Sequence, residues 1–221
     1  MPEPEPLVRW DWLASHVDVL AFRTLEHVVL TVIAVFAGFL LSFGLALIIR
    51  RSPRTYGPIS ASAGIIYTIP SLALFTALVP ITGLSLLTAQ IALVSYTLLI
   101  LVRNTVAGLQ GVPAEVSEAA DAMGYTSWGR LWRVELPLAM PVIIAGLRIA
   151  TVTTIGLVTI AAFIGQGGLG FLITDGLRRF FPTMYVTGAV LSVLLAMAAD
   201  ALFVGAQRVA TPWARTRTEA G

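Results

Sequence analysis

The sequence contains no cysteine, no lysine, only two histidines and few charged residues for its length. Of its 221 residues, 12% are charged and 57% are hydrophobic, whereas a soluble globular domain carries about 25% charged residues. Without cysteine, this sequence can form no disulfide, thiolate metal site or thiol nucleophile. Because His16 and His27 lie before or at the first long apolar stretch, we expect no histidine metal site and no bound metal. The composition predicts an integral membrane protein.

The charged residues predict topology rather than a nucleic-acid partner. The net charge of +2 is too small to favour nucleic acid, and the arginines gather at the ends of apolar stretches. The N-terminal segment 1–6 is acidic and proline-rich, unlike the basic start of a signal peptide.

Five stretches are long and apolar enough to cross a bilayer, which takes about 20 helical residues. They lie at about 25–49, 59–79, 84–102, within 138–164, and at about 184–206. We therefore predict an all-α membrane protein with about five transmembrane helices, the second of which contains Pro70.

The arginines predict which side each loop faces. With the N-terminus outside, the inner segments hold Arg50, Arg51, Arg54, Arg103, Arg130, Arg133, Arg208, Arg215 and Arg217. The outer segments hold Arg9, Arg23, Arg178 and Arg179, and Arg148 lies within a span. Basic residues are enriched in cytoplasmic loops. The N-terminus is therefore expected outside, and the C-terminus and residues 103–137 inside.

The chain is expected to form one transmembrane domain, residues 23–209, between two polar tails. Residues 7–22 are too polar to span a bilayer, but Trp10 and Trp12 favour an amphipathic helix at the outer interface. This helix belongs to an outer tail, residues 1–22, and residues 210–221 form a cytoplasmic tail.

The longest polar interruption predicts two short helices. Pro113 suits the first turn of a helix, and Val116, Ala119, Ala120 and Met123 recur with helical spacing as one apolar stripe. Gly124 can end that helix in a left-handed conformation. Thr126 or Ser127 can cap a second helix, and Pro137 and Pro141 are expected to bend the chain back into the membrane.

The spacing of residues 118–137, within this polar interruption, resembles a motif of a known protein family. Glu118-Ala119-Ala120 is followed by three residues and Gly124, then by nine residues, Val134, one residue and Leu136-Pro137. This resembles the EAA coupling loop of ATP-binding-cassette (ABC) importer permeases, although isoleucine is usual where Val134 stands. The resemblance implies ATPase coupling through Val116, Glu118, Ala119, Ala120, Met123, Gly124 and Pro137. The alternative is an ordinary amphipathic loop helix lying on the membrane.

Further runs resemble the permeases of osmoprotectant importers, which take up glycine betaine, carnitine, choline and proline betaine. These runs are residues 24–27, 67–74, 134–148 and 161–170. The resemblance implies a type I ABC permease fold in a bacterial or archaeal cytoplasmic membrane. The implied partners are membrane lipid, two ATPase subunits that carry ATP and Mg²⁺, a second permease, identical or sister, and an extracytoplasmic binding protein. No cofactor is expected on this chain, which lacks a phosphate-binding glycine loop.

Polar residues within the spans can line a translocation path. The candidates are Tyr67, Thr68, Pro70, Ser71, Thr154 and Gln166; the alternative for each is helix packing or hydrogen bonding between helices. The loop at residues 165–170 is either an outer gate or a tight turn. Arg148 and Asp200 can form an ion pair at membrane depth, or Arg148 can reach the inner headgroups while Asp200 pairs with Arg208 or water.

Other functions remain open at this point. An importer of methionine or another amino-acid derivative would share the same architecture. A membrane enzyme would need several convergent ionisable groups at membrane depth, where only Arg148 and Asp200 lie. A non-transporting scaffold would not need the coupling-loop spacing.

Overall fold

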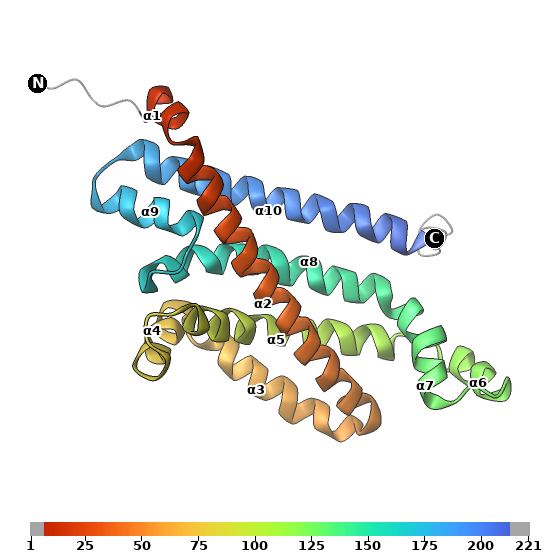
Figure 1. Ribbon diagram of the computed structural model, residues 1–221. Helices are drawn as coiled ribbons and strands as arrows, with labels where there is room; N and C mark the ends of the chain where they lie inside the picture. Colours follow the sequence, from red (N-terminus) through yellow and green to blue (C-terminus); the bar gives the residue numbers. More distant parts are fainter. Residues whose placement is uncertain (1–6, 213–221) are drawn as a thin grey trace, which may run out of the picture.

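The computed structural model describes residues 7–212, which are mostly helical and contain no strand (Figure 1). Within this range four helical segments are long and apolar enough to cross a membrane. They contain α2 (Val17–Arg51), α5 (Leu86–Gln110), α8 (Leu136–Ala161) and α10 (Pro182–Ala210). The all-α class predicted from the composition is confirmed.

The predicted second span is not one continuous helix. A 3₁₀ turn, η1 (Pro53–Thr55), leads into α3 (Tyr56–Thr68), and α4 (Ser71–Thr82) follows after a bend of 96°. Pro70 has no N–H and disfavours a helical conformation at Ile69, which is extended with ψ 129°. The Tyr96 hydroxyl of α5 donates to the Ile69 carbonyl at this break. Five crossings therefore result only if α3 and α4 together form one.

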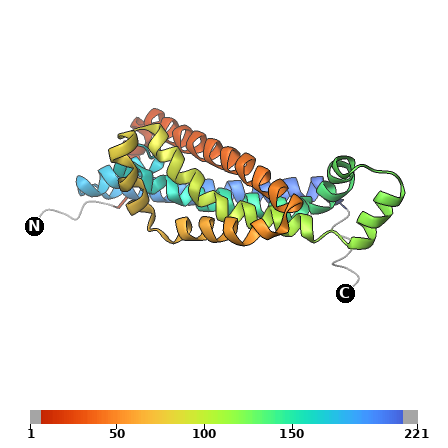
Figure 2. The same ribbon diagram turned by 90° about the horizontal axis from the view of Figure 1, so that it is seen from below.

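The long helices form a layer covered on one face. Figure 1 shows α5, α8 and α10 side by side, with α3 next to α5 and α2 crossing over α5 and α8. Figure 2 shows α2 along one face of this layer. The largest core cluster joins α2, α4, α5 and α8 through residues that include Leu30, Phe75, Leu93 and Val158. Apolar contacts among these four helices hold the bundle together.

The loop between α8 and α9 (Leu169–Arg178) is a tightly packed turn. It follows a 3₁₀ turn, η3 (Ala162–Ile164). Gly168 has φ +45°, and a Cβ there would lie 2.6 Å from the backbone N of His27. Glycine is required by both the backbone conformation and the close approach. The packing favours the tight turn over the flexible outer gate.

The N-terminal helix is shorter than expected. Helix α1 (Trp10–Ser15) ends before Val17, where the long helix α2 already begins. The prediction of one separate helix over residues 7–22 is therefore wrong in its extent. Residues 1–6 of the predicted outer tail and 213–221 of the predicted cytoplasmic tail lie outside the described residues.

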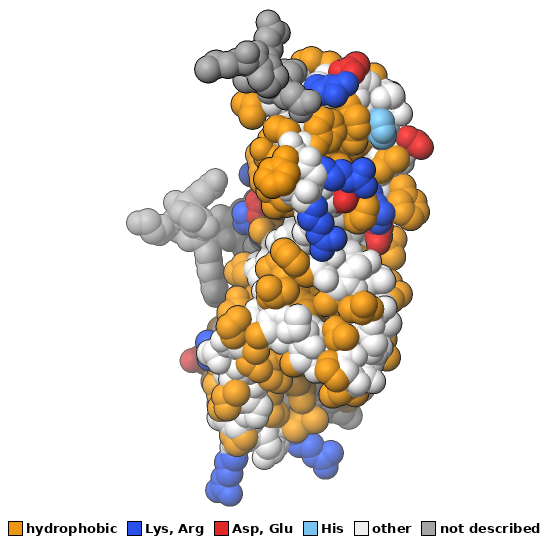
Figure 3. Space-filling view, turned by 90° about the vertical axis from the view of Figure 1, so that its left-hand side faces the viewer, with side chains coloured by type: hydrophobic (Ala, Val, Ile, Leu, Met, Phe, Trp, Pro, Cys, Tyr) orange, Lys and Arg blue, Asp and Glu red, His pale blue; other side chains and the backbone are white. Residues whose placement is uncertain are grey.

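Charged side chains gather on the α1 end of the molecule. Figure 3 shows them in the upper part of this end, above a surface of mixed apolar and uncharged polar groups. They include the ion pairs Arg9–Asp11, Arg23–Glu26 and Arg179–Asp175. The Arg23 guanidinium also lies 4.0 Å from the centre of the Phe171 ring.

The segment that resembles the EAA coupling loop, called the coupling segment below, projects from the opposite end. Helix α6 (Ala114–Ala122) and helix α7 (Ser127–Arg130) extend beyond the long helices in both ribbon views (Figures 1 and 2). Helix α1 and the C-terminal end of α10 lie at opposite ends of the layer. The two ends of a membrane-spanning chain lie on opposite sides when the number of crossings is odd, as it is here when α3 and α4 together count as one crossing.

Cysteine labelling will test the orientation, because the native chain has no cysteine. Met123 in the coupling segment is 71% exposed, and Phe180 between α9 and α10 is 89% exposed. With the N-terminus outside, Phe180→Cys should react with an impermeant thiol reagent on intact cells. Met123→Cys should react only after the cytoplasmic side is opened. The reverse labelling pattern would contradict the predicted orientation.

Candidate functional site

The first coupling helix ends where the sequence predicts. Gly124 has φ +83°, and its N–H donates to the Asp121 carbonyl at 2.9 Å, while the Tyr125 N–H donates to the Ala120 carbonyl at 3.1 Å. These bonds satisfy carbonyls at the helix end, and a left-handed residue without Cβ allows them. At the start of α6, Pro113 is the residue before the helix rather than part of its first turn.

The second coupling helix runs directly into the membrane-spanning segment. The Thr126 Oγ1 accepts from the Gly129 N–H at 3.1 Å and caps α7. One π-helical turn, η2 (Leu131–Glu135), then joins α7 to α8, and residues 127–164 form one helical segment. Neither Pro137 nor Pro141 ends this segment, and Figure 1 shows its ribbon turning between α7 and α8. Pro137 lies in the first turn of α8 and lacks the N–H that a regular turn would donate.

The apolar stripe of α6 is divided between the inside and the surface. Ala120 is 1% exposed, and Val116 is half-buried. Ala119 is exposed, as is Glu118, and Met123 is 71% exposed. The four residues therefore do not form one exposed stripe, and their role in coupling stays a prediction. Ala120 and Val116 hold α6 in place, whereas Ala119 and Met123 remain available to a partner.

Two tryptophans extend the exposed apolar surface. Trp128 is 59% and Trp132 46% exposed, and their rings meet edge to face with centroids 5.7 Å apart. Together with Met123 they line an open hollow of about 580 Å³. We call Met123, Trp128 and Trp132 the docking face. Exposed aromatic and methionine side chains are typical of the centre of a protein interface.

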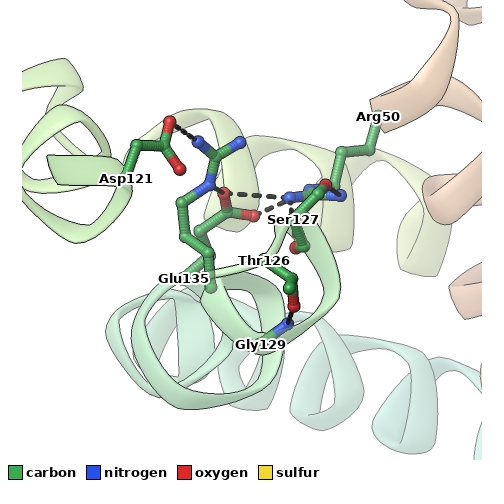
Figure 4. A network of polar contacts seen from close by, with 7 residues as sticks. Arg50, Asp121, Thr126, Ser127, Gly129 and Glu135 are labelled. Atoms are coloured by element: carbon green, nitrogen blue, oxygen red, sulfur yellow. Dashed lines mark hydrogen bonds and ion pairs between the residues drawn. The ribbon is translucent and has the colours of Figure 1, made fainter. Parts of the chain in front are cut away.

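A buried carboxylate connects the coupling helices to α2 (Figure 4). The Glu135 side chain is 9% exposed. The Arg50 Nε donates to its Oε2 at 2.7 Å and the Arg50 Nη2 to its Oε1 at 3.1 Å. The Arg130 Nε donates to the same Oε1 at 2.8 Å, and Arg130 also pairs with Asp121. Two guanidinium groups therefore share one carboxylate.

The same arginine also holds the start of α7. The Arg50 Nη1 donates to the Ser127 Oγ at 3.2 Å, and its Nη2 donates to the Ser127 carbonyl at 3.1 Å. The cluster of Arg50, Asp121, Arg130, Glu135 and Ser127, the arginine–glutamate network below, thus joins the C-terminal end of α2 to α6, α7 and η2. Charge-assisted and bidentate hydrogen bonds are strong and fix the relative geometry of the segments that they join.

Neither Glu135 nor Arg50 is among the functional residues that the sequence predicts. Glu135 lies between the apolar residues Val134 and Leu136, directly before a span. A carboxylate in such surroundings needs a cationic partner. That signal was present in the sequence, but the choice among the nearby arginines required the fold.

The predicted path residues do not form one surface. Tyr67, Thr68 and Pro70 are exposed and Ser71 half-buried at the bend between α3 and α4. Thr154 is 1% exposed, and its Oγ1 donates within its own helix to the Ala150 carbonyl at 2.7 Å. Burial argues against a path role for the Thr154 hydroxyl. Gln166 is half-buried in the turn before α9.

Arg148 and Asp200, which the sequence places at membrane depth, form an ion pair. The Arg148 Nη2 of α8 donates to the Asp200 Oδ2 of α10 at 2.8 Å, and the Arg148 Nε contacts Oδ1. The ion pair expected from the sequence is present. Among residues 7–212, no group of three or more histidines and acidic residues could hold a metal ion.

Comparison with known proteins identifies the family. Residues 25–215 match the family model described as binding-protein-dependent transport system inner membrane component. The choline transport system permease protein OpuBB of Bacillus subtilis (strain 168) is 38% identical over 201 residues, 91% of this chain and 93% of the relative. The osmoprotectant import permease protein OsmW of Salmonella typhimurium is 37% identical over 206 residues, 91% of this chain and 96% of the relative.

A solved structure shows the same fold. A crystal form of the MetNI methionine ABC transporter, in an inward-facing conformation, matches with a TM-score of 0.75 and 23% identity. The match covers 85% of this chain and 94% of the solved chain. The fold is that of type I ABC importer permeases, and the apolar helices fit a multi-pass protein of the cytoplasmic membrane. The chain belongs to the family of binding-protein-dependent transport system inner membrane components.

Proposed function

We propose that this protein is the permease subunit of an ABC importer for quaternary-ammonium osmoprotectants. The observation that carries this proposal is its similarity, over 91% of its length, to permeases named for choline, for glycine betaine, carnitine and choline, and for osmoprotectants. The methionine alternative rests on a likeness of fold at 23% identity. Fold alone does not identify a substrate.

The coupling segment supports an ATPase partner. Glu118 and Ala119 are exposed on α6, and the docking face presents three large apolar side chains. The proposed assembly contains two ATPase subunits, which bind ATP and Mg²⁺, and two permease subunits, identical or sister. A separate extracytoplasmic protein delivers the solute. This chain would perform no hydrolysis itself.

The arginine–glutamate network supports a route for the movement. A force applied to α6 reaches α7 and η2 through the Asp121–Arg130–Glu135 contacts, and α2 through Arg50. Because α7, η2 and α8 form one helical segment, the force continues into the spans. ATPase closure would thereby tilt α2 and α8 together.

Reconstitution tests the proposed function. The permease, its ATPase and its binding protein are placed in proteoliposomes, and ATP-dependent uptake of choline, glycine betaine, carnitine and methionine is measured. Uptake of at least one quaternary-ammonium solute, with none of methionine, is expected. Uptake of methionine alone would replace the proposed substrate class, and ATP-independent uptake would contradict an ABC importer.

A further inference from the structure

The Arg148–Asp200 pair lies close to the middle of its helices. Arg148 is 12 residues after Leu136 and 13 before Ala161, which corresponds to about 18 Å and 20 Å along α8 at 1.5 Å per residue. Asp200 is 18 residues into α10 and 10 before its end. Both charges therefore lie at membrane depth, far from either headgroup region.

The pair is open to the outside of the subunit. The Arg148 side chain is 40% and the Asp200 side chain 37% exposed. They line an open hollow of about 290 Å³ together with four residues of α8, namely Ala145, Ile149, Val152 and Thr153. Both side chains thus retain surface that the rest of the subunit does not cover.

The hollow faces away from α2. Val158, which packs in the core with Leu30 of α2, lies nine residues from Ile149, or about two and a half turns at 3.6 residues per turn. Ile149 therefore lies on the opposite side of α8. Leu138, Val142 and Ile149 are 41%, 39% and 50% exposed. We call this uncovered side of α8, with Arg148, Thr153 and Asp200, the charged flank.

A charged flank at this depth does not suit a lipid-facing position. A charged side chain at the centre of a bilayer costs at least about 2.5 kcal/mol on insertion scales, and such residues almost always face protein or a water-filled cavity. The pair reduces this cost but leaves both groups partly uncovered. The charged flank is therefore expected to face protein or a water-filled cavity rather than lipid.

We propose that the Arg148–Asp200 pair is a contact site for the charged groups of the solute on its path through the membrane. This rests on the proposed function and assigns a solute site within it. The Asp200 carboxylate faces the quaternary ammonium of the solute. The Arg148 guanidinium attracts the carboxylate of a zwitterionic solute such as glycine betaine, whereas choline engages Asp200 alone.

The quaternary ammonium group of the solute suits a site that the solute passes through rather than one where it stays tightly bound. A quaternary ammonium has no N–H and cannot compete for the two hydrogen bonds that Arg148 donates to Asp200. Its attraction to the carboxylate is electrostatic only. Solute can therefore pass without breaking the pair, and a path site must bind weakly enough to release its solute.

Cysteine labelling in proteoliposomes tests whether the charged flank meets water. Thr153→Cys replaces a side chain of similar size beside the pair, and Phe36→Cys, on α2, is the matched control at a site 62% exposed. Thr153→Cys should react with a water-soluble, trimethylammonium-bearing thiol reagent, and loaded binding protein should slow the reaction. Phe36→Cys should stay unlabelled. Equal lack of reaction at both sites, or cross-linking of Thr153→Cys between two permeases, would overturn the proposal.

Charge variants test recognition of the solute. Asp200→Asn leaves Arg148 positive, so choline uptake should fall by about tenfold or more relative to glycine betaine uptake, a factor equivalent to about 1.4 kcal/mol. Arg148→Gln leaves Asp200 negative and should shift the ratio the opposite way. Asp175→Asn, which removes the charge of an aspartate paired with Arg179 at the end of α9, is the control. Equal losses for both solutes, or no loss, would show a purely structural pair.

These two tests separate the inference from the proposed function. If the unmodified complex transports another solute instead, the proposed function fails, but labelling of Thr153→Cys still reports whether the charged flank lines an aqueous path. If the unmodified complex takes up choline and glycine betaine and the ratio does not respond to either variant, only the inference fails.

Discussion

A complex whose permease carries Glu118→Lys and Gly124→Glu is expected to lose uptake by at least about 30-fold, the effect of removing one interface hot spot worth about 2 kcal/mol. Glu118 is exposed on α6, so the lysine would reverse a charge on the surface that we propose meets the ATPase. Gly124 has φ +83°, and a Cβ there would meet no atom within 4 Å. The second change is therefore costly through backbone strain and added charge, not through a clash.

The expected lesion lies in docking and coupling, not in membrane insertion. Measurements are co-purification of the ATPase subunit, ATP-dependent uptake and the amount of folded permease. Asp18→Lys reverses an exposed charge on α2, at the far end of the molecule, and should leave ATPase co-purification intact. Uptake near the unmodified rate in the double variant would rule out α6 as the docking helix.

Glu135→Gln is expected to destabilise the folded permease by about 3 kcal/mol, the low end for breaking a buried ion pair. The low end applies because Arg50 and Arg130 are each 22% exposed and keep some contact with water. Glutamine preserves the shape but removes the charge that both guanidinium groups share. The end of α2 should then separate from α7, and uptake should fall more than ATPase binding does.

The measurement is thermal unfolding of the purified permease, combined with uptake in the complex. Glu115→Gln changes an exposed glutamate of α6 and should have little effect on either. Adding Arg50→Gln to Glu135→Gln should cost less than the sum of the two single changes, because the pair is already broken. Additive losses would mean that Arg50 and Glu135 do not stabilise each other.

Interactions within short stretches of the sequence determine much of this structure, and those features could be predicted from the sequence. Apolar length alone predicts the long helices, since a bilayer demands about 20 residues of helix. The left-handed end at Gly124 and the cap at Thr126 are confirmed, because each depends on bonds spanning only a few residues. The pairing of Arg148 with Asp200 could also be predicted, because few charges at membrane depth were available.

Contacts between distant segments decided the rest. Pro70 indicates a weak point, but a 96° bend is possible because Tyr96 of another helix satisfies the Ile69 carbonyl. Helical spacing places Ala120 and Met123 on one stripe and does not say that Ala120 is buried while Met123 is exposed. Glu135 meets Arg50, 85 residues away, only because α2 ends beside α7. Such positions follow from how whole helices pack, which no short stretch of sequence contains.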